Sequence, residues 1–170
     1  LSNTNDLGAV RDRYPYPKEL MDHWDSLKTG PSRSLGEAMQ RKAQVSMMRS
    51  QFDYEGLCAV LDDLRREYGA EEKFFLTGFS GGGVLTWATL FQHPEWLEAV
   101  ALACSAFLGW NGSIPEGPEK SGLPVTVFQT EKDPVGMNVP QAIKLCEENG
   151  FRTIRQVKVP GLGHDGCHEQ

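Results

Sequence analysis

The stretch that decides the fold is FFLTGFSGGGVLTWATLFQ, residues 74–92. Its first residues, 74–76, are apolar and predict a strand, and residues 84–92 are typical of a helix. Between them, GFSGGG at residues 78–83 contains the pattern G-x-S-x-G. A strand, this pattern and a helix, in that order, indicate a tight turn that lifts the Ser80 hydroxyl off a sheet. The stretch therefore predicts an α/β fold with a serine nucleophile.

Glycines surround Ser80 because the backbone of such a turn is strained. We expect Ser80 to adopt a positive φ, with neighbours small enough for strand and helix to approach each other. The pattern makes Gly78 and Gly82 its two required glycines, and Gly81 and Gly83 relax the turn further. The Gly81 amide lies at a helix N-terminus, where unpaired N–H groups and the helix dipole favour a developing oxyanion. We therefore predict that Gly81 is an oxyanion donor.

Two other interpretations of this turn are weighed against a nucleophile. A glycine-rich turn can merely join a strand to a helix, and the five-residue pattern alone does not exclude this. A phosphate-binding loop fits less well, because the third position of GFSGGG is serine where G-x-G-x-x-G has glycine. The chain also has no Gly-Lys-Ser/Thr for a P-loop. The sequence therefore favours hydrolysis over nucleotide binding.

Asp133 is the predicted acid that would accompany the serine. The apolar run VTVFQ, residues 125–129, predicts a buried strand and leads directly into TEKDP. Open α/β sheets place functional groups just beyond the C-terminal ends of their strands. We expect Asp133 to orient a histidine and to stabilise its charged form. A turn aspartate before Pro134 is the structural alternative, and Glu131 is the second candidate acid.

His164 is the predicted base among the four histidines of the chain. It lies in the glycine-rich segment PGLGHDG, just after the strand-like residues 155–159, and therefore again at the C-terminal edge of the sheet. His164 would remove the Ser80 proton during attack and return it to the leaving group. The other histidines are expected to cap, to pack or to be solvated: His93, His23 and His168.

The composition disfavours several other functions. The 170 residues suffice for one domain with a core, and 39% hydrophobic residues is ordinary for a soluble protein. A net charge of −6 without a cluster of lysine and arginine argues against nucleic acid as a partner. No apolar stretch reaches transmembrane length. We predict no cofactor and an ester partner, small or polymeric, while the oligomeric state and the compartment, cytoplasmic or secreted, stay open.

The four cysteines show no zinc-binding spacing. Three of them fall on predicted core faces and are expected to be packed thiols: Cys58, Cys104 and Cys146. Cys167 follows His164 closely, and its alternatives are a disulfide in an exported protein or a metal cluster with His164, Asp165 and His168. We predict no metal, because a hydrolase needs His164 unliganded.

On these residues the sequence resembles the α/β-hydrolase superfamily, in its esterase and depolymerase-like branch. The resemblance extends from about residue 52 to residue 166 by element order, and its motifs are Ser80 in GFSGG, Asp133 in TEKD and His164 in GLGHDG. It implies a mostly parallel sheet with helices on both faces. It also implies hydrolysis of carboxylic esters through a Ser-Asp-His triad and an acyl-enzyme intermediate. Thioesters, lactones, peptides and polyesters remain open as substrates.

The N-terminal part of the chain departs from this family. Residues 1–73 contain no apolar strand followed by His-Gly, which in the family supplies the second oxyanion amide. Instead, the apolar period of residues 54–68 predicts an amphipathic helix that begins near Ser50 and ends at Gly69. In the family, this helix directly precedes the nucleophile strand. We therefore expect a C-terminal portion of a longer hydrolase, with its early strands missing and its catalytic core at residues 50–170.

The polar residues 1–49 are interpreted as an excursion that contains one helix, within residues 35–48. A roof over the active site and a poorly ordered connector are equal alternatives for it. Phe79, Phe107 and Trp110 are predicted to contact substrate, since they lie at the C-terminal edge of predicted strands, with ordinary packing as the alternative. The competing function is a truncated or degenerate α/β-hydrolase domain without catalysis, acting as a fragment or binding module.

Overall fold

The structure, a computed structural model, describes residues 17–30 and 34–164. The chain divides into two compact units, Leu1–Leu57 and Cys58–Gln170. The boundary between these units and the predicted boundary at residue 50 both fall inside one helix. The assignment of an N-terminal excursion and a catalytic core therefore stays a prediction.

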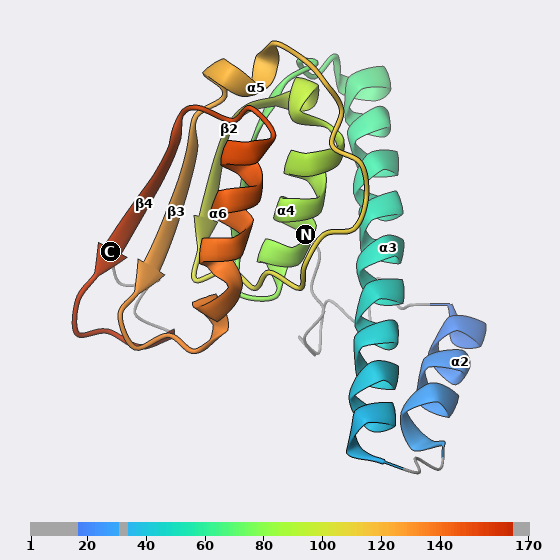
Figure 1. Cartoon of the computed structure of the whole chain (residues 1–170). Coiled ribbons are helices and arrows are strands. Elements are labelled where there is room, and N and C mark those ends of the chain that lie inside the picture. The colour runs from blue at the N-terminus through green and yellow to red at the C-terminus, as the bar shows by residue number, and fades with distance from the viewer. Residues whose placement is uncertain (1–16, 31–33, 165–170) are drawn as a thin grey trace. The chain divides into compact units, whose positions relative to one another are not determined.

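Among the described residues, two helices precede the sheet in the chain (Figure 1). Helix α2 spans Lys18–Thr29, and helix α3 spans Leu35–Tyr68, a length of 34 residues. The helix predicted within residues 35–48 and the helix predicted from Ser50 to Gly69 are both parts of α3, so the predicted start near Ser50 is wrong. Residues 37–55 contain neither glycine nor proline, so nothing in the backbone interrupts the helix there. The predicted stop is confirmed, because Gly69 adopts a φ of 64° directly after the helix.

Four parallel strands form one sheet in the order β1-β2-β3-β4. Strands β1, β3 and β4 lie where the sequence predicts strands, at residues 74–76, 125–129 and 155–159. Helix α4 (Gly82–Gln92) connects β1 to β2, and helix α6 (Val139–Glu148) connects β3 to β4. Parallel neighbours require such crossover connections. All four strands therefore end at the same edge of the sheet, which is the property that gathers the predicted site residues. The strands are β1 (Phe74–Phe79), β2 (Leu97–Ala103), β3 (Val125–Thr130) and β4 (Ile154–Val159).

One face of this sheet is covered by α4 (Gly82–Gln92) and α6 (Val139–Glu148) (Figure 1). Phe91 on α4 is fully buried and contacts the rings of Phe107, Trp110 and other aromatic residues. Burial of a large apolar side chain stabilises a fold by about 1.5–3 kcal/mol. The residues that share this core include Trp87, Leu90, Val100, Leu102, Val125, Val127, Val139, Ala142 and Phe151. The short elements between strands are η1 (Pro94–Trp96), α5 (Glu119–Gly122) and η2 (Val135–Asn138).

The opposite face of the sheet carries apolar residues that stay exposed within the described part of the chain. The side chain of Phe75 is 79% exposed and that of Phe128 is 38% exposed. The expected mostly parallel sheet is confirmed, while helices cover it on one face among the described elements. Within residues 17–30 and 34–164, no helix is both long and apolar enough to span a bilayer.

The cysteines differ from one another in state. Cys58 and Cys146 are free thiols, as expected, whereas Cys104 is disulfide-bonded and so is not the packed thiol that we expected. The apolar sequence around Cys104 predicts the burial of its side chain correctly but carries no information about its oxidation state. Cys167 lies outside the described residues.

Burial raises the pKa of the Cys146 thiol from 9.0 to about 12, because the core does not solvate a thiolate. Above about pH 9 the unfolded chain releases this proton while the folded chain keeps it, so the stabilising contribution present below pH 9 is lost toward pH 12. We expect the free energy of unfolding of the wild type to fall by about 1 kcal/mol per pH unit more than that of Cys146→Ala. Urea unfolding in this pH range measures both slopes, and parallel slopes would contradict the assignment.

Candidate active site

Ser80 lies in the turn between β1 and α4 with a φ of 52°. The expected positive φ is therefore confirmed. The Ser80 amide donates a hydrogen bond to the Ala103 carbonyl at 3.1 Å, which joins the turn to the end of β2. The Ser80 carbonyl accepts hydrogen bonds from the amides of Gly83 at 3.0 Å and Ala106 at 2.9 Å. These hydrogen bonds hold the strained backbone of Ser80 and occupy its amide and carbonyl groups. The side-chain hydroxyl is therefore the polar group that projects from the turn.

Two glycines of this turn have no room for a side chain, and the sequence pattern predicted only one of them. A Cβ on Gly78 would lie 2.8 Å from the Gly82 carbonyl oxygen and would collide with the Thr86 hydroxyl. A Cβ on Gly83 would lie 2.8 Å from the Ser105 Cα and would collide with the Ser105 Cβ. A Cβ on Gly82 would meet no atom within 4 Å. The expectation that Gly82 is sterically required is therefore wrong, and Gly83 takes its place because the end of β2 presses against it.

His164 connects the serine to the aspartate. Its Nε2 lies 2.8 Å from the Ser80 Oγ, and its Nδ1 lies 2.8 Å from the Asp133 Oδ1. Because a carboxylate only accepts, Nδ1 carries the proton, and Nε2 is then free to accept the proton of the serine hydroxyl. The three side chains come from the C-terminal ends of β1, β3 and β4. They form one hydrogen-bonded chain of hydroxyl, imidazole and carboxylate.

Asp133 is the buried end of this chain. Its side chain is 0% exposed, whereas that of His164 is 25% exposed. The Asp133 Oδ1 also accepts a hydrogen bond from the Val135 amide at 2.9 Å, so the aspartate is at the same time a turn residue. The structural and functional alternatives for Asp133 are therefore compatible. A carboxylate in this position can orient an imidazole and stabilise its protonated form.

No protein-family model and no curated protein matches the chain. Solved structures do match it. Esterase PE8 aligns at 22% identity and a TM-score of 0.56, over 75% of this chain and 61% of that one. Arabidopsis thaliana SOBER1, in a point variant, aligns at 23% identity and a TM-score of 0.55, over 69% of this chain and 57% of that one. The Bacillus cereus carboxylesterase aligns at 17% identity and a TM-score of 0.53, over 71% and 54%.

The chain has the α/β-hydrolase fold. At identities of 17–23% the likeness to these three structures concerns the fold alone. The chain spans 54–61% of their lengths, so the α/β-hydrolase fold is represented here in part.

Within this α/β-hydrolase fold, the end of β3 holds the loop that carries His164. The Lys132 amide donates to the Leu162 carbonyl at 3.0 Å, and the Gly161 amide donates to the Glu131 Oε2 at 2.9 Å. Glu131, the second candidate acid, therefore contacts the loop and not the His164 ring. Its role was not foreseen, because the sequence does not reveal which backbone amide a carboxylate will meet.

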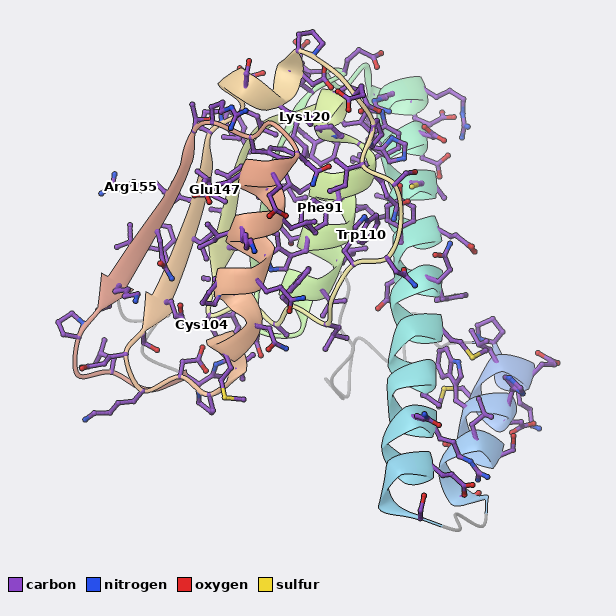
Figure 2. All side chains as sticks on the ribbon, viewed as in Figure 1. Phe91, Cys104, Trp110, Lys120, Glu147 and Arg155 are labelled. Atoms are coloured by element: carbon purple, nitrogen blue, oxygen red, sulfur yellow. The ribbon has the colours of Figure 1, made fainter. Side chains whose placement is uncertain are left out.

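The three residues predicted to contact substrate have different environments in the structure. The Phe79 ring stacks on the His164 imidazole, with ring centroids 5.0 Å apart. Phe107 is 3% exposed and packs edge-on against Trp87, and its contact with substrate stays a prediction. Trp110 packs on Phe91, as Figure 2 shows. Phe107 and Trp110 also line a hollow of about 210 Å³ beside α6, and no member of the hydrogen-bonded trio lines it.

The described residues contain one group of three potential metal ligands: Cys104, Asp133 and His164. Disulfide bonding removes the thiolate of Cys104, and His164 is hydrogen-bonded to Asp133 through one ring nitrogen and to Ser80 through the other. This donor set does not suit a metal. The alternative cluster predicted around His164 needs Asp165, Cys167 and His168, which lie outside the described residues.

The other histidines do not join the trio where the structure describes them. The His93 ring stacks on Trp96 with centroids 3.7 Å apart, and its Nδ1 lies 2.9 Å from the Glu95 Oε1. This agrees with the expectation that His93 packs at the end of α4. His23 lies in α2, and His168 lies outside the described residues.

Proposed function

We propose that the chain is the catalytic portion of a serine hydrolase that cleaves carboxylic esters. The observation that carries this proposal is the hydrogen-bonded chain from the Ser80 Oγ through His164 to the Asp133 Oδ1, with both contacts at 2.8 Å. The fold likeness to esterases supports the class of substrate. Nucleophile, base and acid each have a distinct position in this arrangement, as nucleophilic catalysis requires.

In the proposed acylation step, the His164 Nε2 takes the hydroxyl proton as the Ser80 Oγ attacks the ester carbonyl carbon. The tetrahedral intermediate then collapses, the C–O bond to the alcohol breaks, and His164 returns the proton to the departing alcohol. A water molecule repeats the sequence on the acyl-enzyme and releases the acid. Asp133 stays ionised throughout and holds the imidazole in the tautomer with the proton on Nδ1.

We also propose that the Gly81 amide stabilises the oxyanion. Gly81 directly follows the nucleophile and is the N-cap residue of α4. An N–H group at this end of a helix carries partial positive charge, which stabilises negative charge that develops on the carbonyl oxygen. Loss of one such donor typically lowers kcat by about 10²- to 10³-fold.

The competing proposal is a domain of this fold without catalysis. It is motivated by the share of the solved esterases that the chain spans, 54–61% of their lengths. Within the described residues, β1 is also an edge strand, and edge strands expose backbone groups that can pair with another strand. A binding module would keep the fold without reacting at Ser80.

Covalent labelling separates the two proposals. We expect a fluorophosphonate to label the folded chain at Ser80, with the modified residue identified by peptide mass spectrometry. Ser80→Ala should abolish the label, and Ser121→Ala should keep it, because Ser121 is an exposed serine whose hydroxyl caps the Pro118 carbonyl. A folded wild-type chain that takes up no label would favour the binding module.

Asp133→Asn is expected to lower kcat for p-nitrophenyl acetate by about 10³- to 10⁴-fold with little change in KM. An amide nitrogen in place of a carboxylate oxygen favours the wrong imidazole tautomer and removes the charge that stabilises the imidazolium. Glu131→Gln is the matched control, because Glu131 binds a loop amide and not the ring. We expect it to lose less than about tenfold, and a larger loss at Glu131 than at Asp133 would reverse the two assignments.

A further inference from the structure

Thr130 is a buried polar residue next to the proposed active site with no assigned role. It is the last residue of β3 and is 1% exposed. Its hydroxyl donates a hydrogen bond to the Gly163 carbonyl at 2.8 Å, across 33 positions of sequence. Gly163 directly precedes His164.

The bond from Thr130 acts on the peptide group that carries the proposed base. The Gly163 carbonyl and the His164 amide belong to one planar peptide unit, so fixing the carbonyl oxygen also fixes the nitrogen and constrains the Cα of His164. The loop has little stiffness of its own, because glycine occupies positions 161 and 163 and Gly161 adopts a φ of 78°. An external anchor therefore decides where the imidazole lies.

The same strand end positions the proposed acid. The Asp133 amide donates to the Thr130 carbonyl at 3.3 Å, while the Thr130 side chain holds Gly163. Thr130 thus ties the turn of the acid and the loop of the base to one residue of the sheet. An error in its position would change the contact between His164 and Asp133.

The atoms around the Thr130 side chain determine which of them accepts the hydrogen bond from its hydroxyl group. Besides the Gly163 carbonyl, the Cys104 Sγ lies near the hydroxyl, at 3.6 Å. Cys104 is disulfide-bonded, so it has no S–H to donate, and its sulfur is a weaker acceptor than a carbonyl oxygen. The proton therefore goes to the Gly163 carbonyl, and no other residue type of this size except serine would supply it.

We propose that Thr130 is a positioning residue that holds the His164 imidazole between Ser80 and Asp133 through the Gly163 carbonyl. This inference rests on the proposed hydrolase function. Loss of the hydroxyl leaves the substrate-facing residues unchanged and moves the base, so it affects the chemical step. A misplacement of about 1 Å can lower a rate by about 10²-fold.

Two variants that separate the hydroxyl group from the shape of the side chain test the inference. Thr130→Val keeps the shape and removes the donor, whereas Thr130→Ser keeps the donor and removes a methyl group. We expect Val to lower kcat for p-nitrophenyl acetate by about ten- to a hundredfold with KM within about twofold, and Ser to retain most of the activity. Equal activity of the Val variant and the wild type, or equal losses in Val and Ser, would overturn the inference.

A second readout does not depend on activity. The proton between the His164 Nδ1 and Asp133 should give a downfield NMR resonance in the wild type and in Thr130→Ser that is lost or shifted in Thr130→Val. If Val does not fold, Thr130→Ala, which also removes the hydroxyl donor, replaces it in both measurements. A wild type that is inactive and unlabelled by fluorophosphonate refutes the proposed hydrolase, whereas an active wild type with an unchanged resonance in Val refutes the role of Thr130 alone.

Discussion

Ser80→Ala is expected to lower kcat/KM for p-nitrophenyl acetate by at least about 10⁴-fold. The hydroxyl is the atom that would bond to the acyl group, and the methyl side chain of alanine leaves His164 with no proton to accept at 2.8 Å. The residual rate would come from the Gly81 amide and from substrate binding. Initial rates of nitrophenol release measure the effect.

The structure also predicts what Ser80→Ala leaves intact. Alanine adopts a positive φ no more easily than serine, and the hydrogen bonds that join residue 80 to Gly83, Ala103 and Ala106 use only its backbone atoms. We therefore expect its unfolding curve to stay close to that of the wild type, as that of Ser121→Ala should. A variant that folds and retains more than about a tenth of the activity would exclude Ser80 as the nucleophile.

Gly83→Ala is expected to cost at least about 3 kcal/mol of stability or to prevent folding. The new Cβ would lie 2.8 Å from the Ser105 Cα and 3.1 Å from the Ala106 nitrogen, and backbone cannot rotate away as a side chain can. Displacing Ala106 also endangers its 2.9 Å bond to the Ser80 carbonyl, so the turn itself loses support. Urea unfolding followed by circular dichroism measures the loss.

Gly82→Ala is the matched control for Gly83→Ala. The two glycines are neighbours in the first turn of α4, but a Cβ on Gly82 meets open space. Alanine has a higher helix propensity than glycine, so Gly82→Ala should be neutral or stabilising by up to about 1 kcal/mol. Equal stability of the two variants would contradict the steric argument.

Features with a strong local sequence pattern were predictable, and features without one were not. The α/β-hydrolase sheet was predictable because each strand has its own apolar run, as residues 125–129 show, and the stop of α3 at Gly69 was predictable from a single glycine. The start of α3 was not predictable in the same way. Ser50 is an acceptable first residue for a helix, yet an uninterrupted helical segment already precedes it.

The proposed site shows the same division. Ser80, Asp133 and His164 were predictable because each follows a strand, and parallel strands end at the same edge of the sheet. Residues that follow different strands in the chain can therefore lie close together in the fold. The burial of Phe107 was not predictable, because a position after a strand is compatible both with a pocket and with the core that Phe107 enters. Thr130 was overlooked, since a threonine at the end of a strand has no pattern that reveals its partner 33 residues later.

From local patterns alone, the sequence indicates the order of strands and helices from residue 74 onward, the strained turn at Ser80 and the edge of the sheet at which the polar groups gather. Only the tertiary structure decided that Gly83 is the crowded glycine, that Phe107 is buried and that Thr130 holds the loop of His164. These features differ in the distance along the chain between the residues that cause them. Strand, turn and helix preferences arise from neighbouring residues, whereas steric contact and hydrogen bonding between distant segments depend on how the folded sheet brings them together.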